Sequence, residues 1–229
     1  MARTKASAWK KRRPGTTGAV ATSETSSPSN VRAQRSAERR DAILKAALDE
    51  FAAQGFAATR LDDVARHAGV AKGTIYLHFA DKEALFEEIV RTELGPVVRA
   101  LEQASRAEIS FRVMADQIIE LFVRGIFETR RKDVIRLILT EGPRFPELAE
   151  FYYREIISRV MNTIRAALRR AVERGELAND ALVRFPQLLA APGVMAILWG
   201  SLFDRFEPLD VRALLRAHFE ILLGQGSAP

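Results

Sequence analysis

The stretch Leu61–Leu85, LDDVARHAGVAKGTIYLHFADKEAL, decides the fold that we expect for this chain. Its apolar residues recur at helical spacing on both sides of Gly69, which predicts two short helices joined by a tight turn. Glycine adopts the positive φ that such a turn needs, and the apolar Val70 is expected to pack beneath it. Asp81 is expected to begin a third helix.

The two short helices are predicted from different residues, and the second carries polar groups on its outer face. Thr59 and Asp62 have the spacing of a capping box, in which each side chain bonds the other residue's amide, and they predict the start of the first helix. In the second helix, residues 71–78, we expect Ile75 and Phe79 to point inward. The outward positions then carry a cation, a glycine, a hydroxyl, a phenol and an imidazole: Lys72, Gly73, Thr74, Tyr76 and His78.

These outward groups are of the kinds that bond phosphates and base edges in a DNA major groove. The absence of a side chain at Gly73 would allow the helix to approach a DNA backbone closely. We therefore interpret the segment as a helix-turn-helix whose second helix reads DNA. A structural helical hairpin with a solvated outer face is the alternative.

The segment GFAATRLDDVARHAGVAKGTIYLHFADKEALF, residues 55–86, resembles the N-terminal DNA-binding domain of the TetR family of transcriptional regulators. The resemblance covers roughly residues 37–97. It implies a homodimer that binds a palindromic double-stranded DNA operator, as a repressor released by a small ligand. The pocket residues given below indicate that this small effector is mostly apolar. The resemblance also implies DNA contacts from Thr59, Arg60, Lys72, Gly73, Thr74, Tyr76, His78 and Lys82. An activator, or an architectural DNA-binding protein without an effector, is the alternative.

The first 35 residues differ in composition from the rest. They hold eight Lys or Arg and one Glu, a net charge of +7, whereas the other 194 residues hold 27 basic and 28 acidic residues, a net charge of −1. We expect a disordered basic tail, because few large apolar side chains are present to offset the entropy of ordering. The tail is either a solubilising segment or an arm that contacts DNA. Ser36 is expected to cap the first helix.

The remaining pattern predicts an all-α fold with a DNA-binding domain over residues 36–97 and a helical effector-binding and dimerisation domain over 98–229. Gly95-Pro96 is expected to break or kink the connecting helix. Further helices are expected over residues 111–128, 133–141, 146–174, 181–203 and 208–223. Residues 138–156, ILTEGPRFPELAEFYYREI, resemble the AefR-like branch of TetR C-terminal domains.

The last two helices are apolar enough to suggest a four-helix interface between two copies. The predicted dimer anchors are Leu198, Leu215, Phe219 and Leu222. A mostly apolar ligand pocket is predicted from Met114, Gln117, Phe122, Tyr152, Met161, Met195 and Trp199, with ordinary core packing as the alternative for each. Breaks at Pro186 and Pro192 are expected to open space there.

Several classes of function are not expected. The chain has no cysteine, and its three histidines lack metal-ligand spacing, so we expect no metal and no cofactor. The longest apolar run, Leu188–Phe203, is short for a membrane span and contains proline and glycine, so a cytoplasmic protein without membrane contact is expected. An enzyme is the main rival of another class, but no nucleophile–base pair or paired carboxylate motif is visible.

Overall fold

The computed structural model describes residues 28–178 and 180–224, and within them every regular element is helical, as the sequence predicted. The chain divides into two compact units, Met1–Ser36 and Ala37–Pro229. The helices are α1 (Pro28–Ala58), α2 (Leu61–His67), α3 (Lys72–Tyr76), α4 (Lys82–Ala104), α5 (Phe111–Phe122), η1 (Val123–Phe127), α6 (Arg131–Glu141), α7 (Pro146–Tyr152), η2 (Tyr153–Ile157), α8 (Ser158–Glu173), α9 (Ala181–Arg184), α10 (Gln187–Leu202) and α11 (Val211–Gly224).

The first helix corrects the predicted boundary of the tail. Helix α1 begins at Pro28, so Ser36 lies inside it and does not cap it, and residues 28–35 are helical. Proline suits a first helical position because its missing N–H would be unpaired there in any case. The rest of the predicted basic tail, residues 1–27, lies outside the described residues.

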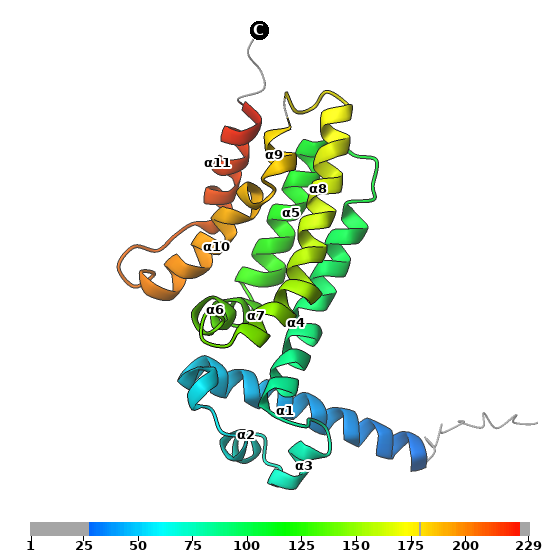
Figure 1. Ribbon diagram of the computed structural model, residues 1–229, viewed down its shortest axis with the longest axis vertical. Helices are drawn as coiled ribbons and strands as arrows, with labels where there is room; N and C mark the ends of the chain where they lie inside the picture. Colours follow the sequence, from blue (N-terminus) through cyan, green and yellow to red (C-terminus); the bar gives the residue numbers. More distant parts are fainter. Residues whose placement is uncertain (1–27, 179, 225–229) are drawn as a thin grey trace, which may run out of the picture. The chain divides into compact units, whose positions relative to one another are not determined.

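Within the second unit, α1 to α4 share one hydrophobic core with α6, α7 and η2 (Figure 1). Phe51, Phe56 and Phe86 pack against one another with ring centroids 5.3–6.2 Å apart. Phe145, from the loop before α7, stands edge-on to Phe56 at 4.9 Å. The helix-turn-helix end therefore has no separate core of its own in this structure.

The second core joins α5, α8, α10 and α11 with the C-terminal half of α4. Figure 1 shows α4, α5 and α8 running alongside one another, with α10 and α11 against one side of them. Helix α4 contributes to both cores: Leu85 and Phe86 are buried in the first, and Leu101 is buried in the second. The expected domain boundary after residue 97 falls inside this helix.

Helix ends follow the sequence in part. Pro146 opens α7, and the predicted helix over residues 146–174 is observed as α7, the π-helical turn η2 and α8 in direct succession. Pro186 does separate α9 from α10, as expected. Gly95-Pro96 does not break α4, and Pro192 lies inside α10.

Candidate nucleic-acid interface and internal cavity

The turn between α2 and α3 has the geometry that the sequence predicted. Gly69 has φ of +66°, and its N–H donates to the Arg66 carbonyl at 3.2 Å. The Val70 N–H donates to the Ala65 carbonyl at 3.0 Å, which completes a Schellman motif. Val70 packs against the first core, as expected. This closure fixes the direction in which α3 leaves α2.

Helix α3 is anchored by its inner face and exposed on its outer face. Ile75 and Phe79 are buried, whereas Tyr76 is 51% exposed and Leu77 is 83% exposed. A Cβ on Gly73 would meet no atom within 4 Å, so packing does not require glycine there. Leu77 is a surface residue that the sequence reading missed. Its only signal was an apolar side chain directly before His78, outside the inward positions.

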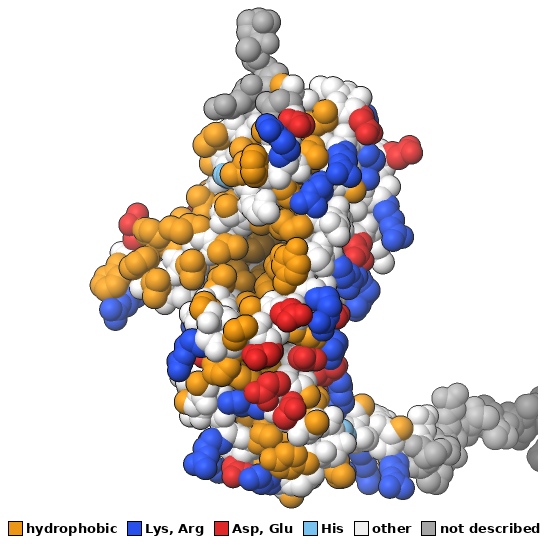
Figure 2. All heavy atoms as spheres, in the orientation of Figure 1, with side chains coloured by type: hydrophobic (Ala, Val, Ile, Leu, Met, Phe, Trp, Pro, Cys, Tyr) orange, Lys and Arg blue, Asp and Glu red, His pale blue; other side chains and the backbone are white. Residues whose placement is uncertain are grey.

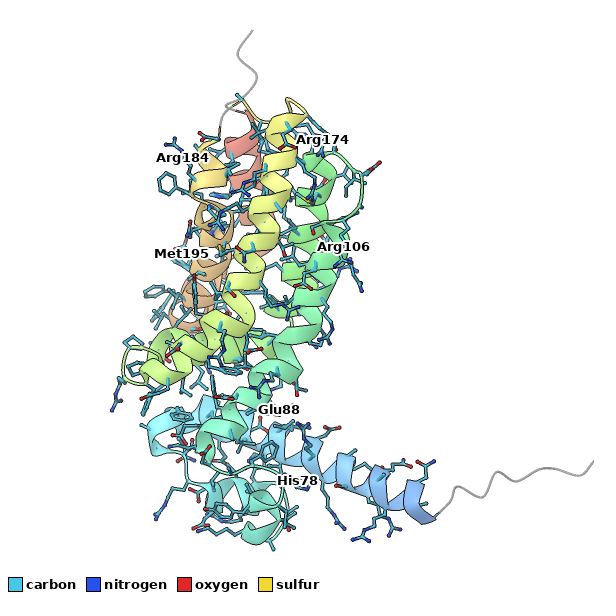
Figure 3. All side chains as sticks on the ribbon, turned by 45° about the vertical axis from the view of Figure 1, so that its right-hand side comes forward. His78, Glu88, Arg106, Arg174, Arg184 and Met195 are labelled. Carbon is cyan, nitrogen blue, oxygen red and sulfur yellow. The ribbon has the colours of Figure 1, made fainter. Side chains whose placement is uncertain are left out.

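The predicted DNA-contact residues on α3 lie together. Lys72, Gly73 and Tyr76 are exposed, while Thr74 and His78 are half-buried. Arg60, at the N-cap of α2, is also exposed. His78 follows α3 in the chain and is labelled in Figure 3. Figure 2 shows basic side chains at this end of the unit and a cluster of acidic side chains above it.

Lys72 is paired within the chain. Its Nζ lies 2.7 Å from Asp62 Oδ1 on α2, with both side chains about half exposed. The hydrogen bond between them raises the pKa of Lys72 above its ordinary value and lowers that of Asp62. The Asp62 carboxylate thus offsets the charge of Lys72 on this exposed face.

Thr59 corrects the predicted contact set. The residue is 3% exposed, and its hydroxyl donates to the Gly55 carbonyl at 2.8 Å. The predicted capping box is therefore wrong: α2 begins after Arg60, which makes no side-chain cap, and the Asp62 carboxylate pairs with Lys72. The reason is Gly55, whose φ of +82° bends α1 and brings its carbonyl within reach of Thr59.

Lys82, another predicted DNA contact, is also bonded within the chain. Its Nζ donates to the Phe56 carbonyl at 2.7 Å and reaches the Ala57 and Thr59 carbonyls at 3.3 and 3.4 Å. The same ammonium lies 4.4 Å from the centre of the Phe56 ring. The ammonium caps the end of α1, because the last carbonyls of a helix have no helical partner of their own. Its contact with a phosphate stays a prediction.

A cavity of about 190 Å³ lies among the helices of the second core. Its walls come from α4, α5, α8, α10 and α11, with contributions from η1, η2 and one residue each of α6 and α7. The lining side chains are apolar apart from Tyr152: Leu94, Val97, Val98, Leu101, Ile118, Ile119, Leu121, Phe122, Ile126, Ile135, Tyr152, Ile156, Ile157, Val160, Met161, Ile164, Leu189, Ala190, Gly193, Val194, Ile197, Leu215 and Phe219. Figure 2 shows the hollow between α10 and α8.

Three of the seven predicted pocket residues line this cavity: Phe122, Tyr152 and Met161. The other four do not. Met114 is buried in the core, and Gln117 is exposed. Met195 is 48% exposed on α10 (Figure 3). Trp199 donates its indole N–H to the Glu207 carbonyl at 2.8 Å and packs on Phe203. An α-helical period shows which residues share a face, but not which neighbour that face meets.

The predicted dimer anchors need a similar correction. Leu215 and Phe219 are 4% and 5% exposed and line the cavity, so they are occupied within one chain. Leu198 and Leu222 are half-buried. Large apolar side chains are exposed instead on other positions of the same two helices: Leu188, Val194, Met195, Leu202 and Ile221.

Two other features bear on function. Among residues 28–178 and 180–224, no group of three or more His, Cys, Asp or Glu side chains is placed to hold a metal ion. Within the same ranges, none of the helices combines the length and the apolar character needed to cross a bilayer.

Comparison with known proteins finds a family match for the helix-turn-helix and another for the helices around the cavity. Residues 43–89 match the family model described as bacterial regulatory proteins, tetR family, and residues 110–218 match a tetracyclin repressor-like C-terminal domain. The second match does not distinguish the AefR-like branch, which stays a prediction.

Individual relatives lead to the same family. The HTH-type transcriptional repressor BepR of Brucella suis is 30% identical over 148 residues, which cover 63% of this chain and 71% of BepR. The repressor KstR2 of Mycolicibacterium smegmatis is 44% identical over 121 residues, 52% of this chain and 57% of KstR2. The crystal structure of FadR from Bacillus subtilis, in complex with stearoyl-CoA, has a TM-score of 0.69 at 23% identity, covering 82% of this chain and 99% of FadR.

Proposed function

The chain belongs to the tetR family of bacterial regulatory proteins, and on that premise we propose that it is a repressor that binds an inverted-repeat operator as a homodimer and is released by an apolar ligand. The observation that carries the DNA-binding part is the outer face of α3. Its Lys72, Gly73 and Tyr76 are exposed around a helix whose inner face is fixed by Ile75. Exposed groups on a rigid short helix suit readout in a major groove.

The operator is identified by selecting bound fragments from random-sequence DNA with the purified full chain. The mutants are then measured on the selected site by fluorescence anisotropy. Tyr76→Phe removes an exposed phenol oxygen, and we expect roughly a tenfold loss of affinity for one lost contact. Tyr153→Phe is the matched control, because Tyr153 is 62% exposed and lies in η2, away from α3. An equal loss in both variants contradicts the assignment of α3.

Gly73→Ala gives an independent test of the same face. The added methyl group meets no atom of the chain, and alanine favours a helix over glycine by about 1 kcal/mol, so the melting temperature should stay or rise slightly. On DNA the same methyl group stands between α3 and the groove, and affinity should fall. A variant that is as stable as the parent and binds as tightly would show that α3 does not approach DNA closely.

The dimer is proposed from the spacing of exposed apolar residues on α10. Leu188, Met195 and Leu202 are separated by seven residues each, so they lie on one face of the helix. The half-buried Leu198 lies on the same face, and Ile221 on α11 is 63% exposed. Pairing α10 and α11 with their copies would bury this stripe in a four-helix interface. A two-fold dimer presents two α3 helices, so the selected DNA should be an inverted repeat.

Release by a ligand is proposed from the course of α4. Its N-terminal end follows directly on α3, where Asp81 caps it through the Ala84 N–H at 2.6 Å. Its C-terminal half lines the cavity with Leu94, Val97, Val98 and Leu101. A ligand that favours a slightly different position of α4 would shift the α3 helices of a dimer relative to the operator.

This cavity also favours a ligand-responsive regulator over an architectural DNA-binding protein, since a protein of the latter kind needs no such space. The FadR structure holds stearoyl-CoA, but its likeness to this chain concerns the fold. Activation of transcription is the alternative to repression. The same proposal places the protein in the cytoplasm. Transcription from a promoter that overlaps the selected operator should rise when the gene for this protein is deleted. A fall in that transcription would favour an activator.

A further inference from the structure

The described lining of the cavity has one polar side chain, Tyr152, among apolar ones. Tyr152 is the only lining residue whose side chain carries a nitrogen or oxygen atom. Its hydroxyl makes no hydrogen bond with any residue that the structure describes. The hydroxyl is also not sealed inside the protein; among the described residues, the one sealed side-chain atom without a partner is Glu141 Oε2. Burial raises the pKa of the Tyr152 phenol, so the group stays protonated at any physiological pH.

Tyr152 is half-buried, and a hydroxyl in apolar surroundings without a partner is costly unless something else bonds it. Water that enters from the open side is a poor partner, because an ordered water needs two to four polar partners and the described walls offer one. Because Tyr152 lines the cavity and its hydroxyl is neither sealed nor bonded within the described residues, we take the cavity to be the open space that the hydroxyl faces. The phenol is therefore free to donate a hydrogen bond to an occupant.

The walls also limit the charge of that occupant. The lining contains no Lys, Arg or His, so a carboxylate or phosphate inside would be desolvated without a counter-ion. The volume limits its size: a cavity of about 150 Å³ holds benzene, and this one measures about 190 Å³. A single substituted ring, or an aliphatic body of the same bulk, fits that space.

We infer that the cavity takes an uncharged, mostly apolar molecule of about one-ring size whose single oxygen acceptor is bonded by the Tyr152 hydroxyl. This inference deepens the ligand-released function proposed above and rests on it. Tyr152 serves here as the group that orients the ligand, while the apolar walls supply most of the affinity. The hydroxyl would discriminate against molecules of the same shape that lack an acceptor.

Three probes of nearly equal size test the inference by isothermal titration with the full chain. Acetophenone carries a neutral acceptor, ethylbenzene replaces it with a methylene group, and benzoate replaces the methyl group of acetophenone with a charged oxygen. We expect acetophenone to bind most tightly, with ethylbenzene about three- to tenfold weaker for the lost hydrogen bond. Benzoate should bind at least about tenfold more weakly than acetophenone, because its charge is desolvated.

The variants separate the hydroxyl from the fold. Tyr152→Phe should lower acetophenone affinity by about three- to tenfold and leave ethylbenzene within about twofold. Tyr153→Phe removes a hydroxyl from the adjacent exposed tyrosine, which does not line the cavity, and should change neither affinity. Melting curves of both variants check that the chain is still folded.

Four results would overturn the inference: benzoate bound as tightly as acetophenone, unchanged acetophenone affinity in Tyr152→Phe, an equal loss in Tyr153→Phe, or no binding of any probe. Operator binding, measured on the same preparations, distinguishes these failures from failure of the proposed function. A chain that binds its operator and is released by an anionic molecule remains a ligand-released repressor and refutes the role given to Tyr152.

Discussion

The turn at Gly69 and the cavity beside Tyr152 differ in the range of the contacts that build them. The turn is closed by hydrogen bonds between residues three and five positions apart, Gly69 to Arg66 and Val70 to Ala65. The cavity is lined by residues from position 94 to position 219. The first is exposed and polar on its outer side, and the second is apolar with one phenol. The turn that orients α3 is therefore fixed by local hydrogen bonds, whereas the cavity depends on the packing of the whole unit.

The largest expected effect comes from placing a charge in the cavity wall. Phe219→Glu puts a carboxylate at a position that is 5% exposed, and we expect a loss of about 4 kcal/mol in the free energy of unfolding. Ile221→Glu introduces the same charge two residues away, where the side chain is 63% exposed, and should cost less than about 1 kcal/mol while weakening the proposed dimer.

Chemical denaturation and analytical ultracentrifugation of the two variants measure these effects. A stable, monomeric Phe219→Glu and a dimeric Ile221→Glu would reverse the roles that the structure gives to the two faces of α11.

The next effect concerns two glycines with positive φ near the reading surface. Gly55 has φ of +82° and ψ of 164°, and a Cβ there would lie 2.9 Å from Glu141 Oε1. Gly69 has φ of +66°, and a Cβ there would meet no atom within 4 Å. We expect Gly55→Ala to lower the free energy of unfolding by about 3 kcal/mol and Gly69→Ala by about 1 kcal/mol. If thermal unfolding shows equal losses of stability for the two variants, backbone strain alone determines both losses.

The smallest effect concerns the charge beside Lys72. Asp62→Asn removes the carboxylate that pairs with Lys72, so operator affinity should rise a few-fold at low salt, with a steeper dependence on salt by about one counter-ion. Asp180→Asn is the control, because Asp180 pairs with Arg184 of α9, which lies at the opposite end of the unit (Figure 3). A drop in affinity for Asp62→Asn alone would show that Asp62 holds Lys72 in the position that DNA requires.

Local chemistry explains which parts of the site were predictable. Glycine and the following apolar residue define the turn by themselves, so Gly69 and Val70 were placed correctly. The bend at Gly55 has no distinct signal in the sequence, because a glycine at the end of a helical pattern is equally typical of a helix end. With that bend, the Thr59 hydroxyl meets a carbonyl four residues back and leaves the predicted cap.

Contacts between distant positions explain the remaining differences. Lys82 bonds the Phe56 carbonyl from 26 residues away, a relation without periodicity in the sequence. Phe219 lies on an apolar stripe that was recognised, but the stripe fits a core as well as a dimer interface. Tyr152 was among the predicted pocket residues, whereas its isolation among apolar walls followed only from the assembled helices.

The core shared by α1 to α4 with α6 and α7 has a consequence for recombining such proteins. Phe145 packs edge-on against Phe56, and the Arg91 guanidinium lies 4.6 Å from the centre of the Phe151 ring, so α7 and the loop before it supply part of the wall that supports the helix-turn-helix. A chimaera that exchanges only residues up to the end of α4 would join unmatched surfaces there. Transplanting the operator specificity of this chain onto another effector domain therefore requires Phe145 and Phe151, or their shapes, in the recipient.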